Sequence, residues 1–331
     1  VISSGSIERP IVFGNNDTPG VVLASAAKEY MKVYGVLVGK KPVVFTNNDS
    51  AYETAIEFKK NNINPIVLDS RQDSNSEIIK EAKSLGIDIK FSHVVVAAKG
   101  YKKVKSCDIA EISEDKQNLN QIKNIECDCI CVSGFWTPTI HLASQSGGKT
   151  KFKEEIDAFV PDKSKQKEVT LGSANGVFTL EETLKTSFDK GFELSKAITN
   201  NNNSQQIPKV SEKKHSKHDK FWCVPLPKGK KYKRFLDFQN DVAVSDIELA
   251  IREGYRSIEH VKRYTTLGMA TDQGKTSNLN GLQLVSNIEN KVVPAVGHTT
   301  FRPPYTPVSI GAIVGREVGK HSKPTRKSPM H

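Results

Sequence analysis

The chain has 331 residues, 37% of them hydrophobic and 26% charged, a composition that suits a globular protein with room for two cores. No apolar run approaches the roughly 18–20 residues of a membrane-spanning helix, which argues against a membrane protein. Much of the formal net charge of +11 lies in residues 209–234, where ten Lys and Arg stand against two acidic residues beside an Asn-rich run. Charge in this setting is typical of a solvated linker and argues against nucleic-acid binding.

Both ends of the chain have unusual sequences for natural termini. The chain begins VISSGSIERP, without Met and without the charged and apolar regions of a signal peptide. It ends in TRKSPMH after a basic loop. We therefore expect both ends to be truncated.

The N-terminal half alternates apolar runs of helix and strand period. Helical spacing predicts helices over 19–34, 51–61 and 76–85, and short buried strands are expected at 42–46, 65–69, 94–97 and 127–133. This alternation predicts an α/β fold of the Rossmann type.

The turn after the first of these strands tests whether this unit binds a dinucleotide. Asp69 ends the next strand and lies about 20 residues beyond the turn, where a ribose-binding acid is expected. The turn itself reads TNNDSA and has no glycine, and Asp49 would repel a pyrophosphate. We predict that the unit keeps the architecture without binding a nucleotide at this turn.

Three cysteines alternate in the last predicted strand of this half. A strand would place Cys127, Cys129 and Cys131 on one face. A zinc site would need CxxC spacing and a second ligand pair, and the sequence has neither. We predict no metal site, and buried free thiols as in a reducing cytoplasm.

Residues 169–180 read VTLGSANGVFTL and precede an amphipathic helix predicted over 179–198. Gly172, Ala174 and Gly176 would let backbone amides at the helix N-terminus face an anion or a ribose. A plain glycine-rich connection explains the segment equally well, and the spacing leaves both interpretations open.

The chain after the polar linker has helical signals and a polar loop. Ser245 to Glu248 form a predicted capping box for a helix that ends at Gly254, and Ser257 opens a second helix. The candidate phosphate ligands near the loop are Lys262, Arg263, Thr265, Thr266, Lys275, Thr276 and Ser277. An ordinary solvated surface loop is the alternative.

Five segments share a pattern with a known family: ERPIVFGNNDTPGVVLASA, FTNNDSAYETA, VSGFWTPTIHLASQSGGK, DFQNDVAVSDIELAIREGYRSIEHVKRYTTLGMATDQGKTSN and TTFRPPYTPVSIGAIVGR. Together they resemble the alpha subunit of heterotetrameric sarcosine oxidase. The resemblance runs through nearly the whole chain and leaves out only the Asn-rich linker.

The resemblance implies a division of the chain. Residues 1–198 would form part of a pyridine nucleotide-disulfide oxidoreductase-like domain that lacks the glycine-rich first half of its NAD site. Residues 199–219 would be the polar linker. Residues 220–331 would form a smaller, mostly helical domain that faces the beta subunit and FMN and leads into an aminomethyltransferase-like folate domain, which is missing.

The resemblance also implies the site residues. NAD would contact Gly172, Ser173, Phe178 and Leu180, although Ser173 departs from the Gly-Asp pair of wider relatives. The FMN interface would include Lys262, Arg263, Thr265, Thr266, Lys275 and Thr276, with a cationic side chain at the flavin phosphate. FAD and the covalent flavin would belong to the beta subunit, and tetrahydrofolate to the missing domain, so no catalytic residue is expected in this chain.

The implied activity is that of an oxidoreductase acting on CH–NH donors with oxygen as acceptor (EC 1.5.3 type). Sarcosine, O2 and tetrahydrofolate would give glycine, 5,10-methylenetetrahydrofolate and H2O2, in a cytoplasmic heterotetramer with beta, gamma and delta subunits. Two alternatives remain: a non-catalytic interaction scaffold, and a stand-alone NAD-dependent oxidoreductase. The second would need a GxGxxG loop and a redox CxxC pair, which the sequence lacks.

Overall fold

The computed structural model describes residues 1–199, 207, 210, 216–303, 306–317, 319 and 328–330. Most of the predicted polar linker, namely residues 200–206, 208–209 and 211–215, lies outside this set.

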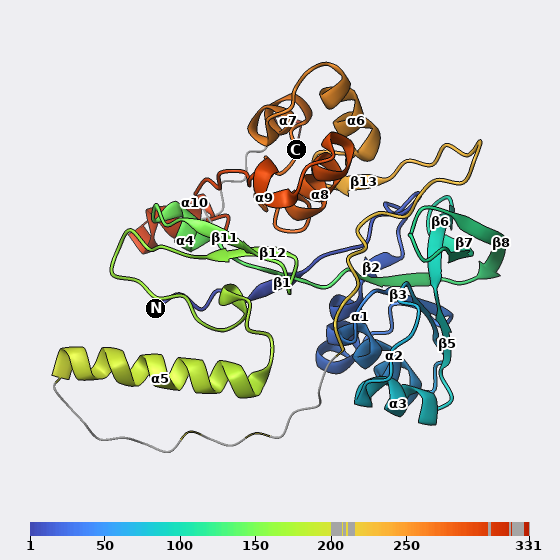
Figure 1. Cartoon of the computed structure of the whole chain (residues 1–331), viewed down its shortest axis with the longest axis horizontal. Coiled ribbons are helices and arrows are strands. Elements are labelled where there is room, and N and C mark those ends of the chain that lie inside the picture. The colour runs from blue at the N-terminus through green and yellow to red at the C-terminus, as the bar shows by residue number, and fades with distance from the viewer. Residues whose placement is uncertain are drawn as a thin grey trace.

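A five-stranded parallel sheet organises the first half of the chain. Its strands follow the order β2 (Val21–Leu23), β9 (Cys129–Ser133), β3 (Pro42–Thr46), β4 (Ile66–Asp69) and β5 (Asp88–Phe91). The helices α1 (Ala24–Tyr34), α2 (Ser50–Lys60) and α3 (Glu77–Ser84) pack on one face. On the other face lies an antiparallel sheet of β6 (His93–Gly100), β7 (Val104–Ile112) and β8 (Leu119–Glu126) (Figure 1). The predicted Rossmann-type α/β fold is confirmed.

The central strands are apolar on both faces because both faces are covered. In β3, Val43 and Phe45 point to the antiparallel sheet, and Val44 points to the helices. In β9, Cys129 and Cys131 share the helix side. Cys127 precedes the strand and packs on the opposite side, so the prediction of three cysteines on one face was wrong.

The predicted helix over 19–34 was too long at its start. Val21–Leu23 pair with residues 130–132 of β9 as the edge strand β2, and the helix begins only at Ala24. Since Val and Leu suit a buried strand as well as a helix, the local pattern did not separate the two elements.

A middle layer joins the α/β part to the helical part. It contains the strand pairs β1 (Ser6–Glu8) with β10 (Trp136–Pro138) and β11 (Thr150–Lys153) with β12 (Ala158–Pro161), together with α4 (His141–Gln145) and the 3-10 turn η1 (Gly172–Asn175). The helix α5 (Leu180–Thr199) follows η1, has no buried residue and lies at the side of the molecule (Figure 1).

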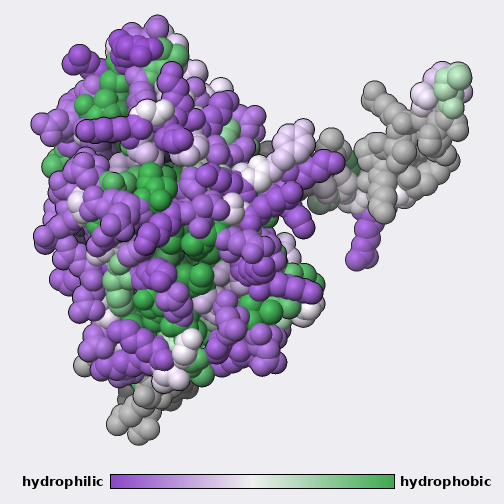
Figure 2. Space-filling model, turned by 90° about the vertical axis from the view of Figure 1, so that its right-hand side faces the viewer, coloured by the Kyte–Doolittle hydropathy of each residue, from purple (hydrophilic) through white to green (hydrophobic). Residues whose placement is uncertain are grey.

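The last part of the chain is mostly helical. It contains β13 (Phe235–Asp237), β14 (Val242–Ala243), α6 (Val244–Arg252), α7 (Ile258–Thr265), α8 (Asn278–Glu289), α9 (Val293–Val296) and α10 (Ile310–Val314). Its core includes Leu236, Ile247, Val261 and Leu282. Figure 2 shows polar residues over most of one face of the molecule, with apolar residues in separate patches.

The two predicted helix starts in this part had different outcomes. The cap of α6 lies two residues earlier than predicted, because the Asp246 carboxylate accepts from the Ala243 N–H at 2.8 Å. The helix α7 begins directly after Ser257, as predicted. In the part of the chain that the structure describes, no helix is both long and apolar enough to cross a membrane.

Candidate functional site

A large opening in the α/β part lies at the carboxyl end of the parallel sheet. From β3 the chain proceeds through α2 and β4 to β5 on one side, while β9 and β2 lie on the other. Open α/β sheets bind ligands in the crevice where the strand order reverses in this way. A cavity of about 500 Å³ lies there, and we call it the main cavity. It is lined by the turn after β3, the residues after β9 and the segment after η1.

The turn that the sequence singled out reaches this cavity. Ser173 and Phe178 both line it, and the Phe178 ring meets Phe135 edge-on at 5.2 Å between centroids. Gly172 and Gly176 take left-handed φ values of +64° and +71°, which glycine adopts without strain. The structure thus brings two of the four predicted NAD residues to the cavity and uses Gly172 to shape the turn. Leu180 begins α5, is 51% exposed and is not among the residues that line the cavity.

The acid at the ribose position is engaged inside the protein. The Asp69 carboxylate pairs with Arg71 at 2.7 Å and accepts from the Tyr52 hydroxyl at 2.8 Å. Arg71 also pairs with Asp49 at 2.8 Å. Burial alone would lower the pKa of Arg71, but Asp69 and Asp49 raise it above its ordinary value. Because the Asp69 residue is 0% exposed, it cannot reach a ligand in the cavity.

A short segment from far along the chain covers the carboxyl ends of two strands of the parallel sheet. We call residues 216–219 the strap. The Ser216 N–H donates to Asp49 Oδ2 at 2.6 Å, and Arg71 Nη1 donates to the Lys217 carbonyl at 3.3 Å. The Asn47 side chain donates to the Asp219 carbonyl at 2.8 Å. The strap therefore lies over the ends of β3 and β4, and its residues 216–218 line the cavity.

Two half-buried rings meet where the strap crosses the cavity wall. The His218 ring stacks on Phe135 with centroids 4.0 Å apart and planes 7° apart. Burial, followed by the charge of Arg9, lowers the pKa of His218 to about 3, so the imidazole is neutral. The Arg9 guanidinium lies 4.0 Å from the centre of the Trp222 ring, and burial lowers its pKa to about 9 although Asp157 opposes the shift.

The residues predicted for the FMN interface do not meet in one cavity. Four of them belong to the end of α7, where Lys262 Nζ donates to the Thr300 carbonyl at 3.0 Å and Arg263 pairs with Glu259 at 3.5 Å. The Thr265 hydroxyl donates to the Val261 carbonyl at 2.8 Å, and Thr266 ends the helix in a left-handed conformation.

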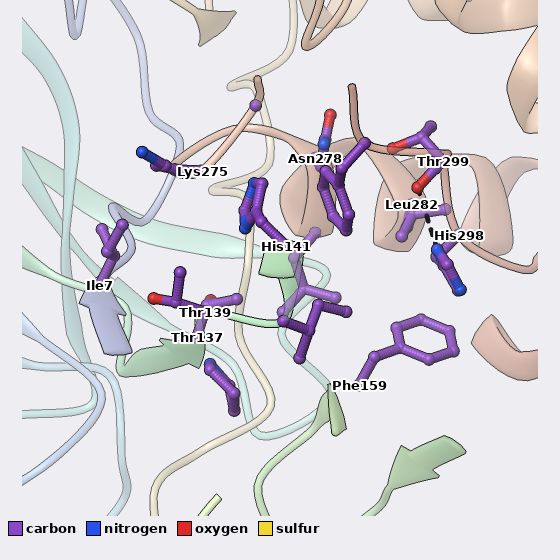
Figure 3. Close-up of a pocket in the computed structure, with 15 residues that line it drawn as sticks. Ile7, Thr137, Thr139, His141, Phe159, Lys275, Asn278, Leu282, His298 and Thr299 are labelled. Atoms are coloured by element: carbon purple, nitrogen blue, oxygen red, sulfur yellow. Dashed lines mark hydrogen bonds between the residues drawn. The ribbon is translucent and has the colours of Figure 1, made fainter. Parts of the chain in front are cut away.

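The other two predicted FMN residues, Lys275 and Thr276, line different cavities. Thr276 borders an opening of about 220 Å³ beside β2. Lys275 borders a narrow cavity of about 40 Å³ together with His141 and Asn278 (Figure 3). Burial, with the charge of Lys275, lowers the pKa of His141 to about 4.

Sequence reasoning missed several residues of the main cavity. Phe135 and Trp136 follow the buried strand β9, a position at the sheet edge that could have marked them. The strap lies in the basic stretch of residues 209–234, and no local signal distinguished His218 from the linker. Among the described residues, no three His, Cys, Asp or Glu side chains are placed to hold a metal ion.

The parallel sheet, the cavity at its strand-order reversal and the covering antiparallel sheet define a Rossmann-type α/β fold. The chain aligns over 93% of its length with 57% of L-proline dehydrogenase from P. horikoshii, with a TM-score of 0.64 and 21% identity. A likeness at this identity shows the fold.

Sequence comparison then gives the family. Residues 231–316 match the family described as the sarcosine oxidase A3 domain. The whole chain is 37% identical to sarcosine oxidase subunit alpha of Rhizobium meliloti (strain 1021) and 35% identical to that of Corynebacterium sp. (strain P-1). It spans 32% and 35% of the lengths of these relatives. Over its whole length the chain is therefore homologous to a segment of sarcosine oxidase alpha subunits.

Proposed function

We propose that the chain is part of a sarcosine oxidase that demethylates sarcosine with O2 and tetrahydrofolate, giving glycine, 5,10-methylenetetrahydrofolate and H2O2. The observation that carries this proposal is the similarity, over the whole chain, to subunits whose names state the activity. The proposal places the protein in the cytoplasm, in a complex with beta, gamma and delta subunits. FAD in the beta subunit would oxidise sarcosine, and a separate folate domain would receive the one-carbon unit.

The first role that we propose for the chain itself is to bind NAD in the cavity of about 500 Å³. The residues fit such a ligand in two respects: Phe135 and Phe178 offer apolar ring faces, and the hydroxyl of Ser173 offers a hydrogen-bonding group. Gly172 and Leu180 would hold the ends of the contacting turn. NAD, when bound, supplies a hydride acceptor, and the residues of this chain bind and orient it.

The second share is one wall of an FMN site. The six interface residues are cationic or hydroxylic, which suits a phosphate. Their fit within this chain is partial, since Lys262 and Arg263 already bind protein groups at the C-terminal end of α7, where the helix dipole favours cations rather than phosphate. We therefore propose that the partner subunit provides the remaining contacts. The match of residues 231–316 to the A3 family supports a separate domain over 220–331, beside a domain over 1–198.

Phe178→Ala tests the NAD share. Loss of the ring that meets Phe135 should weaken NAD⁺ binding about tenfold in calorimetric titration, a loss of roughly 1.4 kcal/mol. Phe192→Ala on α5 is the matched control, because Phe192 does not line the cavity, and it should bind like the unaltered chain. Equal affinities of the two variants would contradict the NAD assignment.

Reconstitution with the beta subunit tests the FMN share. The complex should carry FMN and consume O2 when sarcosine is added. Lys275→Ala should lower the FMN content of the purified complex, and Lys291→Ala, which removes a lysine paired with Glu289, should not. An FMN-free but otherwise intact complex would overturn this assignment and favour the role of a non-catalytic scaffold.

A further inference from the structure

The two helix N-termini that face the main cavity are already occupied by protein groups. At the start of α1, Glu8 Oε2 accepts from the Ser25 N–H at 2.8 Å. At the start of α2, Asn48 Oδ1 accepts from the Ser50 N–H at 3.0 Å, and the Asp49 carboxylate stands at the cap position. Helix N-termini are the usual phosphate sites of this architecture. Because a carboxyl oxygen of Glu8 and an amide oxygen of Asn48 already occupy these two, a phosphate in the cavity needs a cation from elsewhere.

Three of the charged residues that line the cavity form ion pairs, and two further carboxyl groups, Glu8 and Glu155, also line it. Asp49 pairs with Arg71 at 2.8 Å, and Lys28 pairs with Glu53. Lys217 also lines the cavity, and its side chain makes no ion pair with the described residues. Of the two lysines among the described lining residues, Lys217 is the one without an ion pair and is therefore available to a ligand.

The strap fixes where this cation stands. Ser216 is tied to Asp49 at 2.6 Å and to the Ser74 hydroxyl at 2.9 Å. On the other side, His218 stacks on Phe135. Lys217 lies between these two anchored residues, with its carbonyl bound by Arg71 and its side chain exposed. An exposed lysine on an anchored backbone at a cavity rim can bind an anion without being buried at a cost in desolvation.

We propose that Lys217 binds the phosphates of a nucleotide held in this cavity, with the anchored strap forming the rim beside them. This inference rests on the proposed NAD site and names a contact outside the residues assigned to it. The rings of the nucleotide lie against Phe135 and Phe178, and its phosphates face the strap rather than the starts of α1 and α2.

The test compares ligands with and without phosphates. Lys217→Met and Lys217→Arg are titrated with NAD⁺ and with nicotinamide riboside, which has the ring and ribose but no phosphate. Lys228→Met, which removes the same charge from an exposed position outside the cavity, is the control. Lys217→Met should weaken NAD⁺ binding about tenfold and leave nicotinamide riboside binding unchanged, and Lys217→Arg should restore most of the NAD⁺ affinity.

The salt dependence gives a second measurement. Raising the salt concentration should weaken NAD⁺ binding less in Lys217→Met than in the unaltered chain, because one charge contact is gone. If Lys217→Met binds NAD⁺ like the control, or loses both ligands equally, the role of Lys217 is refuted while the NAD site stands. If the unaltered chain shows no saturable NAD⁺ binding, the NAD site and this inference both fall.

Discussion

Removal of Arg71 should destabilise the α/β part more than removal of any exposed cation of equal charge. The Arg71 side chain is 7% exposed, and its partners Asp49 and Asp69 are 1% and 0% exposed. Arg71→Met would leave two buried carboxylates without their cation, and breaking a buried pair costs about 3–5 kcal/mol. The Tyr52 hydroxyl and the Ser216 N–H would still bind these carboxylates, so we expect the lower end, about 3 kcal/mol.

Urea unfolding measures this loss against a matched pair at the surface. Lys41 pairs with Glu126 at 2.8 Å, with side chains 57% and 74% exposed, so Lys41→Met should cost at most about 1 kcal/mol. Adding Asp69→Asn to Arg71→Met removes one uncompensated charge and should recover at least about 1 kcal/mol. A loss below about 1 kcal/mol for Arg71→Met, or no recovery in the double variant, would refute the assignment of buried, mutually dependent charges.

Two further effects follow from burial and backbone geometry. Burial lowers the pKa of His141 to about 4 and that of His218 to about 3, below the roughly 6.5 of an unfolded chain. Because the unfolded state then binds protons at a higher pH than the folded state, the contribution of these two histidines to stability is fully present above about pH 6.5. It is lost as the pH drops toward about 3. His218→Phe cannot titrate and should flatten this loss in Tm measured against pH; an unchanged profile contradicts the effect. Gly176→Ala should cost about 1–2 kcal/mol in urea unfolding, since φ is +71° and an added Cβ would meet Ile156 Cδ1 at 2.6 Å. Gly191→Ala, in open space on α5, should be neutral or stabilising by up to about 1 kcal/mol, and equal losses in both variants would contradict this account.

The central sheet was predictable because its signal is local. Strands covered on both faces need unbroken apolar runs, and β3 and β9 have them, with every residue buried. The edge strand β2 was not separated from α1, because three apolar residues directly before a helix fit either element. Helix starts depended on which side chain turned back to the backbone, and at α6 this was Asp246 rather than Glu248.

The candidate site was only half predictable for a physical reason. The turn at Gly172 and Ser173 is marked by its own glycines, so it could be found in the sequence. The strap depends on contacts between distant residues: Asn47 binds the carbonyl of Asp219, 172 residues further along the chain. The same polar and charged residues that satisfy the sheet edge also give the composition of a solvated linker. A local pattern therefore cannot distinguish the two.

The charged groups at the carboxyl end of the parallel sheet determine which ligands this fold can bind. A Rossmann-type sheet favours phosphate when the N–H groups and positive dipole of a helix start are open to the ligand. Glu8 and Asp49 place carboxyl groups at both starts; burial raises the pKa of Glu8, and Arg71 pairs with Asp49. A dinucleotide in the usual orientation would bring its pyrophosphate against Glu8. The orientation with phosphates toward the strap keeps them away from Glu8 and uses Lys217. The two orientations therefore predict different effects of a substitution at Glu8 on NAD⁺ affinity. Glu8→Gln should leave NAD⁺ affinity nearly unchanged in the strap orientation, and a large gain in affinity would favour the usual one.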